Sequence, residues 1–272
     1  IVHAITEKGR GYTPAEQDLA EKFHAVGVVD PETGVPLRSA VRTWTTVFSE
    51  LMVRFGDTRQ DIVAITAAMQ GPTGLDAFAK AYPARTFDVG IAEQHAVASA
   101  AGMAHAGLHP IFAVYATFLN RAIDQVIMDC ALHHAGVTFA LDRAGVTGDD
   151  GASHNGMWDL ALLRIVPDLE LAAPRDEPTM VAAFEKAVTI KDRPTVVRYP
   201  KGALPPEIPA LSSSDAGDVV WGTPDSSVCI VAVGSMVQTA IDAAGLLASE
   251  GITAHVIDPL WVYPVQIGRA HV

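Results

Sequence analysis

The chain has 272 residues, of which 49% are hydrophobic, so it can bury a large core in one or two domains and is neither disordered nor fibrous. Its 31 acidic and 19 basic side chains give a formal net charge of -12 without any Lys- or Arg-rich run, which argues against a nucleic-acid-binding protein. We find neither an apolar run long enough to span a bilayer nor the charged and apolar segments of a signal peptide.

The first residues predict a strand followed by loops. Residues 1–12 form an apolar run that ends in a Gly-rich loop, and residues 30–36 are rich in turn-forming residues. The chain also starts within the apolar run and without a Met. We therefore expect residues 1–37 to be the end of a domain that begins upstream, followed by a connector.

The middle of the chain predicts an α/β fold. Apolar residues at helical spacing over 41–55 predict a first helix. After it, strand-like runs alternate with helical runs, as in βαβ units on a parallel sheet. We assign residues 38–204 to this domain. The predicted strands are 62–66, 86–89, 111–114, 137–141, 169–172 and 195–198, and the predicted helices are 92–106, 117–133 and 178–191.

The last part of the chain predicts a second, incomplete α/β domain. Residues 205–227 are rich in Pro, Ser, Gly and Asp and are expected to form a linker. Residues 228–266 then restart the pattern with room for about one βαβ unit. Residues 267–272 fit no period, and the codons ATC GGA AGA GCA CAC GTC, which would encode them, resemble a sequencing-library adapter. Our hypothesis is that this tail is artefactual.

The two cysteines indicate a reduced compartment. Cys130 lies in a predicted helix and Cys229 in a predicted buried strand, so both are expected to be small core residues. Such usage is typical of a cytosolic protein, and we expect a cytoplasmic location.

The stretch from Asp88 to His95, Asp-Val-Gly-Ile-Ala-Glu-Gln-His, carries the main functional signal. A strand turns at Gly90 into an Ala- and Gly-rich helix with Glu93 in its first turn, at the sheet edge where ligands bind. With Gly90 as N-cap, Glu93 could instead be a capping residue at the third helical position. The whole string resembles the pyrimidine-binding domain of thiamine diphosphate enzymes of the transketolase and pyruvate dehydrogenase kind. That resemblance implies that Glu93 bonds to the aminopyrimidine ring of the cofactor.

A second stretch runs from Tyr115 to Gln125. The resemblance implies that Phe118 stacks on the pyrimidine and that the Tyr115 hydroxyl meets the substrate. Arg121 can share a helical face with Phe118 and is a candidate for binding substrate phosphate. The alternative is an aromatic anchor in the core with Arg121 at the surface.

The most specific stretch is residues 142–164. It begins Asp-Arg-Ala-Gly and continues with many Gly, Asp and Ser residues, which predicts an ordered functional loop. Its pattern resembles the 1-deoxyxylulose-5-phosphate synthase family more closely than transketolases. The resemblance implies that Arg143 and Arg198 bind the phosphate of glyceraldehyde 3-phosphate, and paired donors suit both for this. It also implies that Asp150 and His154 line the pyruvate-derived group, although each could be an ordinary loop residue.

Two residues near the start of the chain complete the predicted site. By the same resemblance, Tyr12 touches the thiamine cofactor and His24 reaches the active site. Taken alone, Tyr12 could be a packing aromatic and His24 a solvated loop residue.

The metal motif of these enzymes is absent. It consists of Gly-Asp-Gly followed by an Asn, whose oxygens hold the Mg²⁺ that clamps the diphosphate. Residues 148–151 match it only in part, and Asn120 and Asn155 are at the wrong distances. We therefore expect no metal ligand in this chain, and we expect Mg²⁺ to be held by a domain upstream of Ile1.

The resemblance covers roughly residues 1–265 and implies a fragment of a cytoplasmic homodimeric enzyme. Such an enzyme decarboxylates pyruvate with thiamine diphosphate and transfers two carbons to glyceraldehyde 3-phosphate, for isoprenoid, thiamine and pyridoxal synthesis. The fragment alone should be inactive. One alternative is a transketolase or the β-subunit of a 2-oxo acid dehydrogenase. The alternative from another class is a non-catalytic interface or regulatory module.

Overall fold

The computed structural model describes residues 1–18, 22–24, 26–37 and 41–264, in two compact units, Ile1–Val41 and Arg42–Val272. The first unit contains α1 (Thr13–Gln17) and a bridge between Val29 and Pro36. The strand expected over residues 1–12 is not formed, because no described segment pairs with it and a strand needs a partner for its backbone groups. The suspected artefactual tail, 267–272, lies outside the described residues.

A seven-stranded sheet organises the second unit, in the order β11-β5-β6-β4-β3-β1-β2. All of its pairings are parallel except that of β11 with β5. The α/β prediction is therefore confirmed. The strands are β1 (Ile62–Thr66), β2 (Thr86–Asp88), β3 (His109–Tyr115), β4 (Thr138–Asp142), β5 (Glu170–Ala172), β6 (Thr195–Arg198) and β11 (Trp261–Tyr263).

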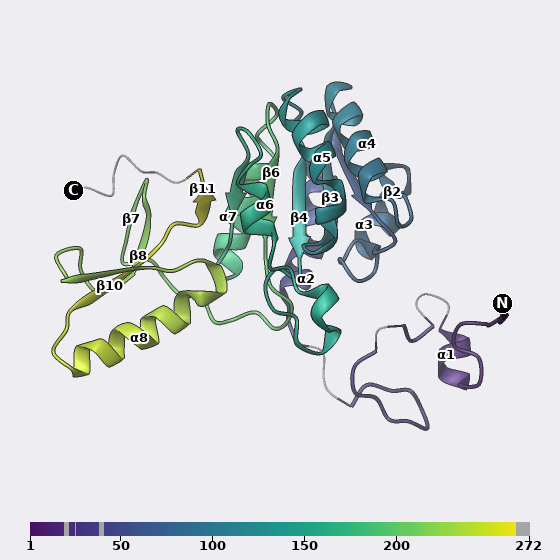
Figure 1. Ribbon diagram of the computed structural model, residues 1–272, viewed down its shortest axis with the longest axis horizontal. Helices are drawn as coiled ribbons and strands as arrows, with labels where there is room; N and C mark the ends of the chain where they lie inside the picture. Colours follow the sequence, from purple (N-terminus) through teal and green to yellow (C-terminus); the bar gives the residue numbers. More distant parts are fainter. Residues whose placement is uncertain (19–21, 25, 38–40, 265–272) are drawn as a thin grey trace. The chain divides into compact units, whose positions relative to one another are not determined.

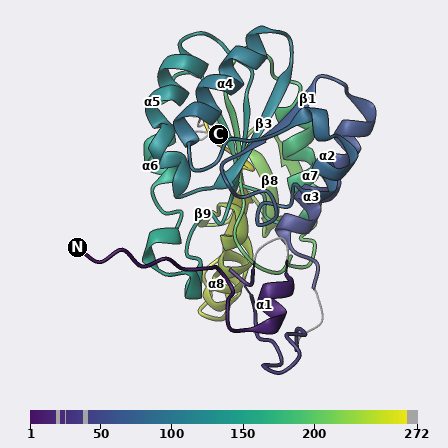
Figure 2. The same ribbon diagram turned by 90° about the vertical axis from the view of Figure 1, so that its right-hand side faces the viewer.

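Helices cover both faces of this sheet (Figures 1 and 2). Every residue of β3 is buried, and its side chains alternate between two cores. Phe112 and Val114 pack in the core beneath one helical layer, whereas Ile111 and Ala113 pack in the other. The first layer contains α4 (Glu93–His105), α5 (Ile123–Gln125) and α6 (Asp159–Leu163), and the second contains α2 (Trp44–Thr58), α3 (Asp76–Ala81) and α7 (Glu177–Ala187).

The helix expected over 117–133 is irregular. It consists of a 3₁₀ turn, η2 (Phe118–Ala122), then α5, then a π-helical segment, η3 (Val126–Ala131). Residues three apart eclipse one another in a 3₁₀ turn, which brings Arg121 over Phe118. The short helices elsewhere are η1 (Pro83–Arg85), η4 (Gly148–Asp150), η5 (Ala152–His154) and η6 (Gly234–Met236).

The expected linker, 205–227, is partly wrong, since it contains two strands of a smaller sheet. The order of this sheet is β7-β8-β10-β9, with β8 antiparallel to β10. Strand β7 is polar, and the apolar residues of β8, Val219, Val220 and Trp221, are consecutive, so neither strand shows an alternating apolar pattern. The elements are β7 (Ser212–Ser214), β8 (Gly217–Trp221), β9 (Val228–Val231), α8 (Val237–Ser249) and β10 (Ala254–Asp258). The chain then returns to the large sheet as β11.

Only one of the cysteine predictions holds. Cys130 is buried, but Cys229 is exposed. Strand β9 is an edge strand whose residues alternate between partly buried and exposed, and Cys229 falls on the exposed side.

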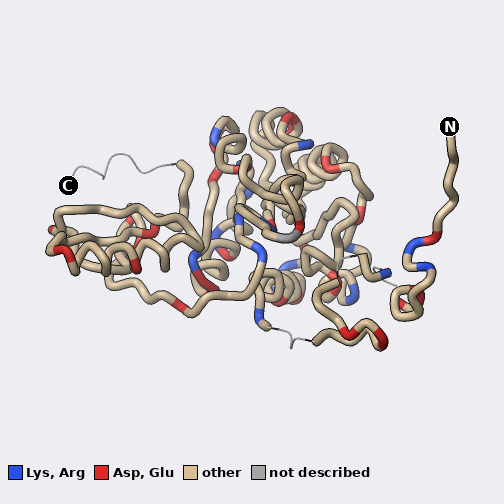
Figure 3. The backbone as a smooth tube through the Cα atoms, turned by 60° about the horizontal axis from the view of Figure 1, so that its bottom comes forward, with Lys and Arg blue, Asp and Glu red and all other residues tan. Residues whose placement is uncertain are grey.

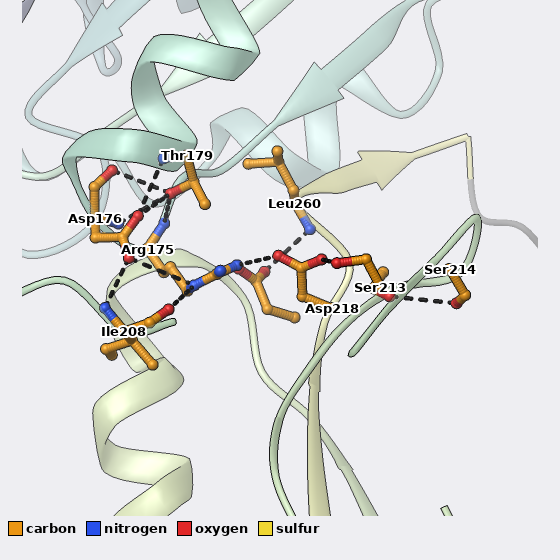
Figure 4. Close-up of polar contacts among 10 residues, drawn as sticks. Arg175, Asp176, Thr179, Ile208, Ser213, Ser214, Asp218 and Leu260 are labelled. Atoms are coloured by element: carbon orange, nitrogen blue, oxygen red, sulfur yellow. Dashed lines mark hydrogen bonds and ion pairs between the residues drawn. The ribbon is translucent and has the colours of Figure 1, made fainter. Parts of the chain in front are cut away.

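A buried ion cluster links the two sheets (Figure 4). Arg175, just after β5, is 5% exposed, and its Nη1 lies 2.7 Å from Asp258 Oδ2 in β10 and 2.8 Å from Asp218 Oδ2 in β8. Its Nε donates to the carbonyl of Ile208 and lies 3.6 Å from Asp176. No Lys or Arg occurs between Lys201 and Arg269, so the smaller sheet is acidic (Figure 3). The segment after β5 of the large sheet therefore supplies the cation that pairs with Asp218 and Asp258 of the smaller sheet. We call Arg175, Asp176, Asp218 and Asp258 the Arg175 cluster.

Candidate functional site

The predicted site residues of the second unit follow the carboxyl ends of neighbouring strands. Tyr115 ends β3, Arg143 follows β4, Arg198 ends β6, and Glu93 begins the helix after β2. Because these strands are parallel, their carboxyl ends share one edge of the sheet, where α/β proteins bind ligands.

Glu93 is the first residue of α4 and is 2% exposed. The N-cap is Ala92, not Gly90, and no side chain caps the helix. The capping alternative, with Glu93 at the third position, is therefore wrong. The chain turns before the helix because Gly90 adopts φ +70° and Asp88 Oδ1 accepts hydrogen bonds from the backbone of Gly90 and Ala68.

The Glu93 carboxylate is incompletely paired. Its Oε2 is buried and has no hydrogen-bond partner among the described residues. The nearest cation is Arg121, whose Nη1 lies 3.7 Å away on a side chain that is 53% exposed. A buried polar atom without a hydrogen bond costs about 1–3 kcal/mol. Such an atom needs an explanation, and a bound group, an ion or an ordered water supplies the missing partner in folded proteins.

Aromatic side chains gather next to this carboxylate. The rings of Tyr115 and Phe118 are stacked at 5.9 Å with an interplanar angle of 15°. His154 meets both edge-on, at 6.4 Å and 5.5 Å. Arg121 Cζ lies 5.8 Å from the centre of the Phe118 ring. The structure thus brings together four predicted site residues that are up to 39 positions apart in sequence.

The loop that carries His154 is held tightly against the end of β3. Gly145 and Gly156 exchange backbone hydrogen bonds, both of 2.9 Å. A Cβ on Gly156 would meet Ala116 Cβ at 2.6 Å, so only Gly allows this approach. Asn155 Oδ1 accepts from the backbone and hydroxyl of Thr147. Asn155 therefore organises the loop.

Arg143 lies within a group of opposite charges. Its Cζ is 3.9 Å from the centre of the Tyr115 ring, its Nη1 is 3.2 Å from Asp142 Oδ2, and its Nε is 3.8 Å from Asp150 Oδ2. Asp150 Oδ1 in turn accepts from Lys201 Nζ at 2.6 Å. We call Asp142, Arg143, Asp150 and Lys201 the Arg143 cluster.

Arg198 is engaged by a different carboxylate. Its Nε donates to Asp159 Oδ2 at 2.7 Å, and Asp159 is 3% exposed. The β4–β6 register sets Arg198 opposite Leu141, so both predicted phosphate-binding arginines come from adjacent strand ends. No described contact joins the two guanidinium groups.

Three partners of these residues, Asp142, Asp159 and Lys201, are not predicted from the sequence. Asp142 and Asp159 lie in the stretch 142–164, and Lys201 follows Arg198 by three positions. Their charge is visible in the sequence, but only the fold shows which arginine or carboxylate each one meets. Burial raises the pKa of Asp142 to about 6, although Arg143 and Thr45 oppose this. Burial, together with the nearby Asp142, also raises the pKa of Tyr199.

Tyr12 and His24 belong to the first unit, which is described by itself. The Tyr12 ring meets Phe23 edge-on at 5.7 Å, and His24 is exposed. Among the described residues, no group of three or more His, Cys, Asp or Glu side chains could hold a metal ion. Nor does the described part of the chain include a helix with the length and apolar character required to cross a bilayer.

Two family models match the chain. "Transketolase, pyrimidine binding domain" matches residues 40–207, and "Transketolase, C-terminal domain" matches residues 217–268.

Similar proteins include two curated synthases. 1-Deoxy-D-xylulose-5-phosphate synthase 2 of Streptomyces avermitilis is 59% identical over 272 residues, 99% of this chain and 42% of that protein. 1-Deoxy-D-xylulose-5-phosphate synthase 1 of Kitasatospora griseola is 61% identical over 268 residues, 98% of this chain and 41% of that protein. The chain thus spans less than half the length of these relatives.

Among solved structures, a split-gene transketolase described as an inactive beta4 tetramer is 31% identical with a TM-score of 0.70, covering 83% of this chain and 74% of that one. The transketolase of Campylobacter jejuni has a TM-score of 0.74 at 15% identity over 84% of this chain and 37% of its own, and so shares the fold alone.

Proposed function

The chain belongs to the transketolase family through its pyrimidine-binding domain, and on this premise we propose that its protein acts as a 1-deoxy-D-xylulose-5-phosphate synthase. Its substrates are pyruvate and glyceraldehyde 3-phosphate. The Streptomyces and Kitasatospora synthases support this assignment, because their identity to the chain extends over both matched domains.

One observation carries the proposal: the buried Oε2 of Glu93 has no hydrogen-bond partner among the described residues and lies beside stacked aromatic rings. Thiamine diphosphate fits these residues, since its aminopyrimidine ring offers a flat face to Phe118 and a ring nitrogen to the carboxylate. When bound, the cofactor supplies the carbon nucleophile and the electron sink for decarboxylation of pyruvate. With the cofactor bound, Glu93 would hold a proton at its carboxylate and exchange it with the ring nitrogen.

The other residues bind and orient the substrates. Tyr115, His154 and Asp150 line the pyruvate-derived group, which the tightly held loop encloses against β3. Arg143, Arg198 and Arg121 bind the phosphate of glyceraldehyde 3-phosphate. Arg198 is oriented by Asp159, and both Arg143 and Arg198 offer guanidinium N–H donors suited to a phosphate.

The rest of the cofactor site needs a diphosphate-binding domain that holds Mg²⁺. The segment 1–37 is the end of that domain and its connector, and it contributes Tyr12 and His24. In this scheme, 38–204 is the pyrimidine domain and 228–266 the start of the C-terminal domain. We propose a cytoplasmic homodimer that also feeds thiamine synthesis. The split-gene transketolase supports an inactive state for the chain alone, since that protein is described as an inactive tetramer.

A chimera tests this function directly. The matching 42% of the Streptomyces avermitilis synthase is replaced by this chain, and product formation from pyruvate and glyceraldehyde 3-phosphate is measured. We expect 1-deoxy-D-xylulose 5-phosphate from the chimera and none from the chain alone. The unmodified Streptomyces enzyme is the control.

The same assay separates the alternatives. Product with a ketose phosphate donor and none with pyruvate would indicate a transketolase. A folded chimera with no activity toward either donor would overturn the enzymatic proposal and favour an interface or regulatory module.

A further inference from the structure

Asp142 is a buried carboxylate to which the proposed reaction gives no role. It is the last residue of β4 and is 0% exposed. Burial disfavours its charged form and raises its pKa to about 6. A carboxylate in such a place is retained only with close partners.

Both oxygens of Asp142 have such partners. Oδ1 accepts from the backbone N–H of Arg143 at 2.6 Å. Oδ2 accepts from Thr45 Oγ1 in α2 at 2.7 Å and lies 3.2 Å from Arg143 Nη1. Arg143 has φ +59°, a left-handed conformation that residues other than Gly rarely adopt. In this conformation a single carboxylate holds both the backbone and the side chain of the next residue.

These contacts fix the Arg143 guanidinium on several sides. Its Cζ lies over the Tyr115 ring at 3.9 Å, and Nη1 also donates to the carbonyl of Pro72 at 3.3 Å. Its Nε is near Asp150 Oδ2. Nη2 has no hydrogen-bond acceptor within the described ranges, and the side chain is 16% exposed. One nitrogen is therefore available to an anion.

We propose that Asp142 is a positioning residue that holds the guanidinium of Arg143 against the ring of Tyr115 and thereby fixes where a phosphate group binds. The phosphate part rests on the proposed function, whereas the coupling of Asp142 to Arg143 does not.

The coupling has a spectroscopic signature. Arg143 Cζ lies 3.9 Å from the centre of the Tyr115 ring, so we expect the ring current to shift the NMR signals of the protons on the neighbouring Nε and Cδ upfield. In Asp142→Asn, one side-chain atom must become an N–H donor opposite either Arg143 Nη1 or the Arg143 backbone N–H. Two donors repel, so the guanidinium leaves the ring, and the signals move toward those of free arginine.

The experiment uses the 272-residue chain and sulfate as the phosphate probe, because sulfate does not titrate near neutral pH. In Asp142→Asn we expect the upfield shift to be lost and sulfate affinity to fall about tenfold or more, as for one charge-assisted hydrogen bond. Asp258→Asn is the matched control, since it removes a buried carboxylate that also pairs with an arginine. It should lower stability and leave both readouts unchanged.

The outcomes separate the two proposals. An unchanged Arg143 signal in folded Asp142→Asn would overturn the positioning role. A lost upfield shift with unchanged sulfate affinity would support that role and overturn phosphate binding by Arg143.

If Asp142→Asn does not fold, a pH titration of the wild-type chain, followed by the NMR signal of the Arg143 side chain, tests the positioning role instead. The other titratable and charged groups that face this site are Tyr199, Asp150, Lys201 and His154, so the titration is repeated in His154→Asn. A signal that moves with a midpoint near pH 6 in both proteins supports the positioning role. The carboxyl carbon signal of Asp142 is followed in the same titration, and an Arg143 signal that stays constant while Asp142 titrates contradicts the positioning role.

Discussion

Two arginines of this chain lie among carboxylates, Arg175 buried and Arg143 with a side chain that is 16% exposed, and the hydrogen bonding around them differs. In the Arg175 cluster no buried side-chain oxygen or nitrogen lacks a hydrogen-bond partner within the described residues. Asp176 accepts from Thr179 and Ile208, Asp258 from Leu260, and both pair with the guanidinium (Figure 4). At the sheet edge around Arg143, by contrast, Glu93 Oε2, Asp150 Oδ2 and the Tyr199 hydroxyl are buried with no hydrogen-bond partner in the described part of the chain.

Backbone strain differs in the same way. Arg143 has a positive φ, whereas Arg175 is not among the residues with one. Unpaired polar atoms and strained residues both cost stability and are concentrated at functional sites. We infer that the Arg175 cluster serves stability, and the unpaired atoms and backbone strain at the sheet edge support the binding site proposed there.

Breaking the Arg175 cluster should have the largest effect on stability. Arg175→Met leaves three aspartates near one another without their cation, two of them fully buried. We expect a loss of about 3–5 kcal/mol in the free energy of unfolding, as for other broken buried pairs. Urea unfolding of the chain measures it.

The control for that experiment is Arg54→Met, which removes an exposed pair with Glu185. It should cost no more than about 1 kcal/mol. Equal losses in the two variants would show that the Arg175 cluster is not a major source of stability.

Unlike the carboxylates of the Arg175 cluster, Asp142 should destabilise the folded chain when it is ionised, and the pH dependence of stability should show this. Its folded pKa, about 6, lies above the ordinary value of 3.8, so the ionised form destabilises the folded chain above pH 6. That penalty disappears as the pH falls through 6. Relative to Asp142→Asn, the wild type should gain about 1.4 kcal/mol between roughly pH 7.5 and pH 5.

Urea unfolding of the two proteins over this pH range measures the difference. The contributions of titratable groups that both proteins share cancel in it. A wild type that loses stability relative to the variant over the same range would mean that Arg143 and Thr45 outweigh burial at Asp142.

The sequence predicts the fold well where apolar residues form a clear run or repeat. The fully buried strands β1, β3 and β4 stand out as apolar runs, so the parallel sheet and its ligand-binding edge follow from the pattern. Strands β7 and β8 do not, because β7 is polar and exposed and the apolar residues of β8 are consecutive rather than alternating. These strands form through the pairing of β7 with β8 and of β8 with β10. The return of β11 to the large sheet likewise depends on a pairing distant in sequence.

The site is predictable in its residue types and less so in its partners. The motifs contain Glu93, Tyr115, Phe118, Arg143 and His154, which the fold gathers at one edge. They do not show that Glu93 begins its helix, because Gly90, Ile91 and Ala92 are all acceptable first-turn residues. Nor do they show that Asp159 pairs with Arg198, since that contact depends on how α6 packs.

The smallest effect on stability, and the most direct test of the pyrimidine-binding site, comes from Glu93→Gln. Gln keeps the shape of the side chain and its place at the helix start, so the free energy of unfolding of the chain should change by no more than about 1 kcal/mol. In the chimera with the Streptomyces synthase, the same substitution should slow pyruvate turnover by on the order of 10² or more, as for loss of a positioned acid or base. Near-normal turnover in a folded, cofactor-saturated variant would contradict the claim that the sheet edge is a pyrimidine-binding site centred on Glu93.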